Sequence, residues 1–301
     1  MQYAALANLP TEGTHADAPG LDQRSPAEIL QVLHRAQVEA AKAVAEALPA
    51  LERATLAVEK ALREGGNLVY AAAGSSALQA MADGLEIPPT FGIPVERIHI
   101  LRAGGLKDLS VAKEGAEDDE KAAKAAAEVI GPKDAVICLA ASGNTIYPVT
   151  IMEIAKARGA TTIGISNNPG AKLLSADIAV LLPTPPEVIA GSTRLGAGTA
   201  QKIALNLMST LLGIRMGHVL DGLMVNVATS NIKLRGRAAG IVMRVTGCDE
   251  AAAKAALEQA DWGVKEAILI VSGAGGLAEA EDYLERAGQN LRAALAELSG
   301  A

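Results

Sequence analysis

Two short stretches of the sequence place glycine beside hydroxyl side chains directly after an apolar run. The first is Ala73-Gly74-Ser75-Ser76 and the second is Ala141-Ser142-Gly143-Asn144-Thr145. Each precedes a segment with helical periodicity, so backbone N–H groups and hydroxyls can converge on an anion there. Ordinary capped strand-to-helix turns are the other interpretation of either loop. Finding two such loops favours an anion site.

Two acidic residues are candidates for acid/base chemistry beside these loops. Glu86 precedes Pro88, which restricts the residue before it and predicts that the helix after the first loop ends there. Glu117 lies in the acidic stretch 114–120, for which a solvated helix start is the alternative interpretation. Two carboxylates in different surroundings suit a reaction in which one group donates a proton while the other removes one. Whether these two side chains meet depends on the fold.

The elements that would position the loops are short apolar runs separated by helical or turn segments. Five strands are predicted, at residues 67–73, 97–101, 135–141, 162–166 and 178–182. Nearly continuous apolar strands that alternate with helices predict a parallel α/β sheet covered on both faces. Ligands of such sheets bind at the carboxyl ends of the strands, where both glycine and hydroxyl loops fall.

Helical segments flank the predicted sheet. Apolar positions recur at helical spacing over residues 25–63, and Ser25 with Glu28 resembles a capping box. A long helix is predicted within residues 191–217, and a small helical bundle from Asp249 onward. The predicted organisation is an N-terminal helical segment (1–60), an α/β domain (61–240) and a C-terminal helical domain (241–301).

One glycine-rich stretch superficially matches a dinucleotide fingerprint. Gly273-Ala274-Gly275-Gly276-Leu277-Ala278 has the G-x-G-x-x-A spacing after an apolar run. Too little chain follows it to complete a βαβ unit and to place an acidic residue on a ribose. We therefore predict a loop between helices, and a nicotinamide cofactor is disfavoured.

Composition excludes several classes of function. The formal charge of -7 and the 2% aromatic content argue against a nucleic-acid partner, which needs cations and stacking surfaces. No apolar run reaches the roughly 18 residues of a membrane helix, so no membrane partner is expected. The four histidines lack metal-ligand spacing and the two cysteines lie far apart, so neither a metal site nor a disulfide framework is predicted. A reducing cytoplasm fits this pattern.

An ordered set of further motifs extends over most of the chain. They are Thr11-Glu12-Gly13, Leu21-Asp22, Glu86 before residues 88–92, residues 103–105, 114–118 and 141–143, Glu187-Val188, residues 191–194, 197–202 and 223–225, Asn231 and Lys233-Leu234. This set resembles the N-acetylmuramic acid 6-phosphate etherases, which belong to the wider sugar isomerase (SIS) fold of phosphosugar proteins. The resemblance implies a three-layer α/β fold with a five-stranded parallel sheet, preceded by N-terminal helices and followed by a small helical bundle.

The resemblance also implies a reaction and the residues that perform it. The expected reaction cleaves the ether between D-lactate and C3 of the 6-phosphorylated amino sugar, giving N-acetylglucosamine 6-phosphate in cell-wall recycling, without a cofactor. Glu86 is expected to protonate the lactate oxygen and then activate water, and Glu117 to remove the C2 proton. A homodimer with a shared active site is implied as well. The residues expected to bind the sugar phosphate are Gly74, Ser75, Ser76, Ser142, Gly143, Asn144, Thr145, Glu187, Ser192, Thr193 and Lys202.

Three positions depart from the family pattern by losing a cation. Leu78 and Asn144 stand where the family has arginine, and Gly196 stands where it has lysine. Arginine binds phosphate and carboxylate with two parallel hydrogen bonds, so its loss can shift the preferred substrate. Two alternatives therefore stay open: a related SIS lyase or isomerase that acts on another amino-sugar phosphate, and a non-catalytic phosphosugar-binding regulator.

Overall fold

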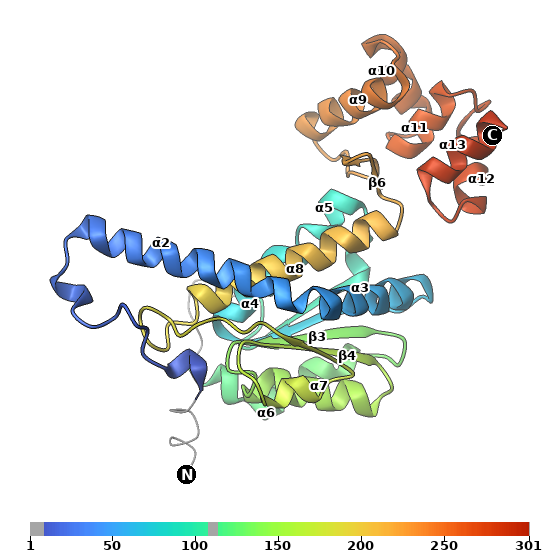
Figure 1. The fold of residues 1–301 in the computed structure, drawn as a ribbon. Coiled ribbons are helices and arrows are strands. Elements are labelled where there is room, and N and C mark those ends of the chain that lie inside the picture. The colour runs from blue at the N-terminus through green and yellow to red at the C-terminus, as the bar shows by residue number, and fades with distance from the viewer. Residues whose placement is uncertain (1–8, 108–113, 301) are drawn as a thin grey trace. The chain divides into compact units, whose positions relative to one another are not determined.

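A parallel five-stranded sheet forms the centre of the first of two units into which the chain packs (Figure 1). The computed structural model describes residues 9–107 and 114–300. Unit 1 contains the described residues up to Gly84 and Glu96–Ser209, and unit 2 contains Leu85–Val95 and the described residues from Thr210 onward. The sheet and both glycine and hydroxyl loops therefore belong to unit 1.

The five predicted strands are confirmed, and no end is shifted by more than one residue. They are β1 (Leu68–Ala72), β2 (Ile98–Arg102), β3 (Ala135–Ala140), β4 (Thr161–Ser166) and β5 (Ile178–Leu181). Their order in the sheet is β2-β1-β3-β4-β5, and every pairing is parallel. The strand after β1 is added on one side of it, and the remaining strands are added on the other side. The order of strands therefore reverses between β1 and β3, where a crevice opens at their carboxyl ends. In the register of β1 and β3, Ala72 lies opposite Leu139, so both strands end at the same level.

Helices cover both faces of this sheet and confirm the three-layer architecture (Figure 1). On one face, α6 (Glu120–Ala126) and α7 (Ile146–Ala157) pack on buried side chains of β1 and β3. On the other face lie α3 (Leu48–Arg63), α4 (Gly74–Gly84) and α8 (Gly196–Arg215), with α2 (Pro26–Ala43) alongside. The capping box at the start of α2 is present, because Glu28 N–H donates to Ser25 Oγ and Ser25 N–H donates to Glu28 Oε2 at 2.9 Å.

A buried carboxylate ties three elements of unit 1 together. Asp83, near the end of α4, accepts hydrogen bonds from Tyr70 in β1 and from Asn206 and Ser209 in α8, each at 2.7 Å. Burial, followed by the charge of Asp83, raises the pKa of the Tyr70 phenol well above its usual range. Because every oxygen of Asp83 is engaged, this contact fixes the strand, the first-loop helix and α8 as one frame.

Unit 2 is a small helical bundle with one short hairpin. Its helices are α5 (Ile87–Phe91), α9 (Ile232–Thr246), α10 (Glu250–Gln259), α11 (Val264–Val271), α12 (Leu277–Arg286) and α13 (Leu291–Ser299). The hairpin pairs β6 (Val219–Leu220) with β7 (Leu223–Met224). The glycine-rich stretch at 273–276 connects α11 with α12, so the predicted loop between helices is confirmed. No helix in the described part of the chain is both long and apolar enough to cross a bilayer.

Each unit contains one cysteine. Cys138 lies fully buried in β3, and Cys248 is half-buried between α9 and α10. Burial raises the pKa of the Cys138 thiol far above its usual value. The β3 thiol is therefore protonated and shielded in the folded protein.

A fully buried lysine in unit 2 predicts an unusual dependence of stability on pH. Lys265 Nζ lies 3.0 Å from His218 Nδ1 and donates to the Gln289 carbonyl at 2.8 Å. Burial lowers the pKa of Lys265 from its ordinary 10.5 to about 8, while the charge of Glu266 opposes that shift. Because the folded pKa is the lower one, the unfolded chain binds the extra proton between these two values.

The stability of unit 2 should therefore rise as pH increases from about 8 to 10.5, by roughly 3 kcal/mol in the free energy of unfolding. Chemical denaturation of the parent and of Lys265→Met across this range measures the difference. Comparing the two proteins removes titrations common to both, such as that of Tyr70. A pH dependence that is the same in both proteins would contradict the assignment.

Candidate functional site

The first loop brings a glutamate into close contact with a glycine. Ala73 follows β1, and α4 begins at Gly74, whose φ of +54° is in the left-handed region. A Cβ atom on Gly74 would lie 2.5 Å from Glu117 Oε1, so only glycine leaves room for this carboxylate. Glu117 itself comes from a short turn at Ala116–Asp118, after β2. The carboxylate of Glu117 therefore lies against the first loop.

The second loop is shaped by its own side chains. Ser142 Oγ lies 3.3 Å from Thr145 Oγ1 and accepts the Asn144 N–H at 3.2 Å. Gly143 has φ +66°, and a Cβ there would lie 2.5 Å from Ala171 Cβ. The Gly143 carbonyl accepts the Leu173 N–H at 3.0 Å. Thr145 is the N-cap residue of α7, but its side chain makes no capping hydrogen bond to that helix. Its hydroxyl instead lies near that of Ser142 in the same loop.

A cavity of about 140 Å³ joins the two loops within unit 1. Its walls supply hydroxyls, the backbone of two helix starts and two carboxylates, and none of the lining residues is lysine, arginine or histidine. The N–H groups in the first turn of a helix have no hydrogen-bond acceptor within that helix. The starts of α4 and α7 can therefore donate hydrogen bonds to an anion here. The lining residues are Glu12, Ala73, Gly74, Ser75, Ser76, Glu117, Ala140, Ala141, Ser142, Thr145, Gly191 and Thr193.

The structure brings together some of the predicted site residues and separates others. Gly74, Ser75, Ser76, Ser142, Thr145, Thr193 and Glu117 line the cavity, whereas Gly143, Asn144, Ser192, Glu187 and Lys202 do not. Asn144 Oδ1 accepts the Lys172 N–H at 2.9 Å, so its side chain is directed to the loop after β4. Ser192 is half-buried beside the wall residue Thr193, and Lys202 is exposed on α8.

Glu187 is placed as a capping residue of α8. Its two carboxylate oxygens accept the N–H groups of Gly196 and Ala197, each at 2.9 Å, and the residue is 4% exposed. A carboxylate at a helix N-terminus is stabilised by the unpaired N–H groups and by the helix dipole. A Cβ on Gly196 would lie 3.1 Å from Glu187 Oε2, so a side chain at this position would require a small shift of the Glu187 carboxylate.

Glu86 belongs to unit 2 and directly precedes α5. The residue is exposed, and the helix that follows it has Pro88 and Pro89 in its first turn. The sequence predicted a helix end at this position, and α4 does stop at Gly84, but the prolines then occupy the first turn of a new helix. Asn226 donates to the Phe91 carbonyl at 2.9 Å and so fixes α5 inside unit 2.

Glu12 lines the cavity although it is not among the site residues predicted from the sequence. It lies at the end of a short turn, Pro10–Glu12, and a Cβ on Gly191 would come within 3.0 Å of its Oε2. The motif Thr11-Glu12-Gly13 was the available signal. No local pattern connects it with the loops, because its partners lie more than 150 positions away.

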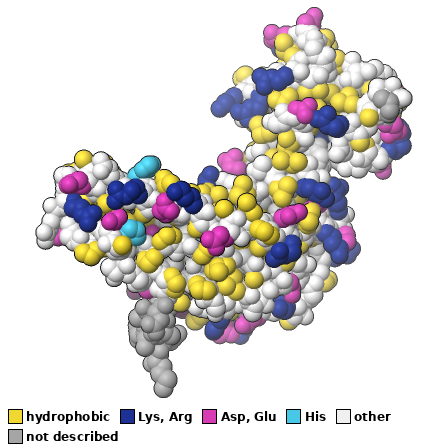
Figure 2. All heavy atoms as spheres, viewed as in Figure 1, with side chains coloured by type: hydrophobic (Ala, Val, Ile, Leu, Met, Phe, Trp, Pro, Cys, Tyr) yellow, Lys and Arg dark blue, Asp and Glu magenta, His cyan; other side chains and the backbone are white. Residues whose placement is uncertain are grey.

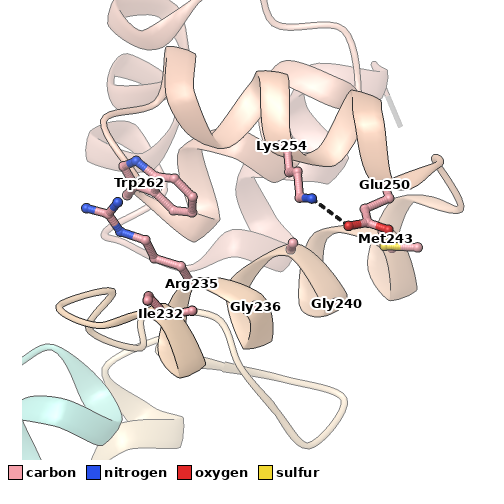
Figure 3. A pocket seen from close by; sticks show the side chains of 9 residues that line it. Ile232, Arg235, Gly236, Gly240, Met243, Glu250, Lys254 and Trp262 are labelled. Carbon is pink, nitrogen blue, oxygen red and sulfur yellow. Dashed lines mark ion pairs between the residues drawn. The ribbon is translucent and has the colours of Figure 1, made fainter.

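A larger cavity of about 400 Å³ lies in unit 2, along α9 (Figure 3). Arg235 lies over the Trp262 ring at 4.5 Å from its centroid, and Lys254 pairs with Glu250 at 2.6 Å. None of the predicted site residues lines this cavity. Among the described residues, no group of three or more histidine, cysteine or acidic side chains could hold a metal ion in either unit. The loops of unit 1 are therefore the candidate site.

Comparison with known proteins identifies the fold and the family of the chain. The SIS domain family model matches residues 33–167, which include both loops. A phosphoheptose isomerase from Francisella tularensis has a similar structure, with a TM-score of 0.50, 17% identity and coverage of 64% of this chain and 100% of that chain. At this identity the similarity shows the fold alone.

Closer relatives match almost the whole chain. The N-acetylmuramic acid 6-phosphate etherase of Deinococcus radiodurans is 44% identical over 290 residues, covering 95% of either chain. That of Symbiobacterium thermophilum is 42% identical over 268 residues, covering 88% of this chain and 89% of its own. The resemblance inferred from the ordered motifs is thereby confirmed. The chain belongs to the N-acetylmuramic acid 6-phosphate etherase family.

Proposed function

We propose that this chain is a carbon-oxygen lyase that cleaves the D-lactyl ether of N-acetylmuramic acid 6-phosphate, giving N-acetylglucosamine 6-phosphate and D-lactate. The observation that carries the proposal is the position of Glu117, whose carboxylate lies against Gly74 in a cavity that also contains the hydroxyls and helix starts of both loops. A phosphate placed on those donors holds a sugar within reach of a base. The choice of substrate is supported by the N-acetylmuramic acid 6-phosphate etherase of Deinococcus radiodurans, which matches 95% of the chain.

The proposed reaction proceeds by elimination and then hydration. Ser75, Ser76, Ser142 and Thr145 bind the 6-phosphate of the open-chain sugar. Glu117 removes the proton at C2, the C2–H electrons form a C2–C3 double bond, and the C3–O bond to lactate breaks. Glu86 protonates the departing lactate oxygen and then takes a proton from water, whose oxygen adds to C3 while C2 regains a proton. These steps move only protons and electron pairs, so the proposal needs no cofactor.

The lost cations favour a second candidate within the same chemistry. None of the cavity's lining residues is lysine or arginine, and Asn144, at one of the family's arginine positions, is directed to Lys172 instead. A phosphate held by neutral donors alone is bound without bidentate charge pairing. Another 6-phosphorylated amino sugar, with a different group at C3, is therefore the alternative substrate.

Product analysis tests both candidates. The purified protein is incubated in D₂O with N-acetylmuramic acid 6-phosphate and, separately, with other 6-phosphorylated amino sugars, and the products are identified by mass. The expected result is D-lactate together with N-acetylglucosamine 6-phosphate that carries one deuterium at C2. Lactate release without deuterium at C2 would rule out elimination, and turnover of another sugar alone would select the second candidate.

A cytoplasmic homodimer with a shared active site is part of the proposal. Exposed apolar side chains support a partner surface on unit 1, and Figure 2 shows hydrophobic side chains gathered on the face turned to the viewer. The exposed apolar side chains of unit 1 include Leu30 in α2, Leu78 in α4 and Leu207 in α8, which are 66%, 56% and 43% exposed. Light scattering should give twice the chain mass of 30.7 kDa, and a monomer in the active fraction would refute the shared site.

A further inference from the structure

The N-terminal turn that ends in Glu12 is locked to the second loop. Asn168 Oδ1 accepts the Thr11 N–H at 3.2 Å, and Asn168 Nδ2 donates to Thr11 Oγ1 at 2.9 Å and to the Ala141 carbonyl at 2.8 Å. The Thr11 carbonyl accepts the Gly191 N–H at 3.3 Å. Asn168 and Thr11 are fully buried. Thr11, directly before Glu12, is thus held by three hydrogen bonds, and a fourth ties its partner Asn168 to the second loop.

These hydrogen bonds place Glu12 at the cavity wall, but none of them involves the Glu12 side chain. Its carboxylate lies against Gly191, at 3.0 Å from where a Cβ would stand, and the residue is exposed. Within residues 9–107 and 114–300, no hydrogen bond or ion pair involves its oxygens. A capping or structural carboxylate would be paired, as Glu187 is. The free acceptors of Glu12 therefore face the space that a ligand would fill.

The charge of Glu12 limits what it can bind. A carboxylate repels a phosphate dianion and accepts hydrogen bonds only from donors such as hydroxyl and amide N–H groups. The cavity lining contains both kinds of group, with hydroxyls and helix starts from the loops and carboxylates from Glu12 and Glu117. A ligand that satisfies both has a phosphate group and hydrogen-bond donors.

We infer that Glu12 is a substrate-contacting residue that accepts hydrogen bonds from hydroxyl or amide donors of the sugar and so selects a sugar phosphate over phosphate itself. This inference rests on the proposed function, because it uses the same cavity and the same phosphate loops. Glu12 takes no part in the proton transfers assigned to Glu86 and Glu117. The N-terminal turn is then a wall of the site, and Asn168 is its positioning residue.

Binding measurements with two probes test the assignment. The affinities of N-acetylglucosamine 6-phosphate and of inorganic phosphate are measured by calorimetry for the parent, for Glu12→Ala and for the control Glu52→Ala, an exposed carboxylate on α3. Glu12→Ala should bind the sugar phosphate at least tenfold more weakly, because a charge-assisted hydrogen bond is lost. Its affinity for inorganic phosphate should be unchanged or slightly higher. Glu52→Ala should match the parent with both probes.

A second variant distinguishes direct substrate binding by Glu12 from the positioning of its turn by Thr11 and Asn168. Thr11→Val removes the hydroxyl that accepts from Asn168, so it should raise KM in the parent background but add nothing to the loss already caused by Glu12→Ala. Additive losses would mean that the turn acts only through stability. Equal weakening of both probes by Glu12→Ala would also overturn the assignment.

The outcomes distinguish this inference from the proposed function. If the parent releases lactate and Glu12→Ala binds sugar phosphate as tightly as the parent, only the role of Glu12 is lost. If the parent binds the sugar phosphate and Glu12 selects it, but no lactate is released, the proposed reaction fails and the binding role stands. If the parent binds neither probe, both are refuted.

Discussion

Glu117→Gln is expected to lower kcat by roughly 10³-fold while the KM for the sugar phosphate changes little. Glutamine keeps the shape of the side chain beside Gly74 but cannot remove the C2 proton. A direct readout is the exchange of the C2 hydrogen of N-acetylglucosamine 6-phosphate with D₂O, which reports proton removal separately from lactate release. The exchange should disappear together with turnover.

Two companion variants make this expectation specific. Asp118→Asn changes an exposed carboxylate of the same turn that does not line the cavity, and it should leave kcat near the parent value. Gly74→Ala should lower kcat without removing any functional group, because its Cβ would lie 2.5 Å from Glu117 Oε1 and displace the carboxylate. A Glu117→Gln protein that retains C2 exchange would assign the base to another residue.

Gly143→Ala is expected to destabilise unit 1 by about 3 kcal/mol and to abolish sugar-phosphate binding. The left-handed φ of +66° disfavours any side chain, and the new methyl group would lie 2.5 Å from Ala171 Cβ and 2.7 Å from Ser166 Cβ. The loop can relieve these contacts only by moving Ser142 and Thr145, which the cavity needs as donors. Thermal unfolding and calorimetric binding measure the two effects.

Gly170→Ala is the matched control for this prediction. Gly170 has a similar φ of +72°, lies in the loop after β4, and has no atom within 4 Å of the position of a Cβ. It should show only the backbone cost of about 1 kcal/mol and bind the sugar phosphate normally. Equal losses in the two variants would mean that backbone conformation, and not the crowding at Ser166 and Ala171, sets the effect.

The strands of unit 1 were predictable because their buried runs are short, apolar and separated by clear turn signals. β1 and β3 are buried along their whole length, which is why their apolar residues form unbroken runs in the sequence. The capping box at Ser25 was visible for a similar reason, since both partners lie within one turn. The short hairpin of β6 and β7 has only two residues in each strand and gives no such pattern.

Side-chain direction was what the sequence could not supply. Asn144 lies in the second loop and Glu187 lies in one of the family motifs, yet their side-chain oxygens accept backbone N–H groups of Lys172, Gly196 and Ala197. Glu12 shows the opposite case, because it reaches the cavity through an asparagine far along the chain. Contacts across such distances depend on the packed sheet and have no local signature.

Each unit contains one cysteine whose labelling rate can report on the opening of that unit. A thiol reagent can modify Cys138 only after β3 opens, since the side chain is fully buried and its pKa is raised, whereas Cys248 is half-buried in unit 2. In a Cys248→Ser protein, the labelling rate of the remaining thiol would follow the opening of the sheet alone. A ligand bound between the loops of β1 and β3 should slow that rate in proportion to its occupancy. The labelling rate of Cys138 therefore measures ligand binding at these loops.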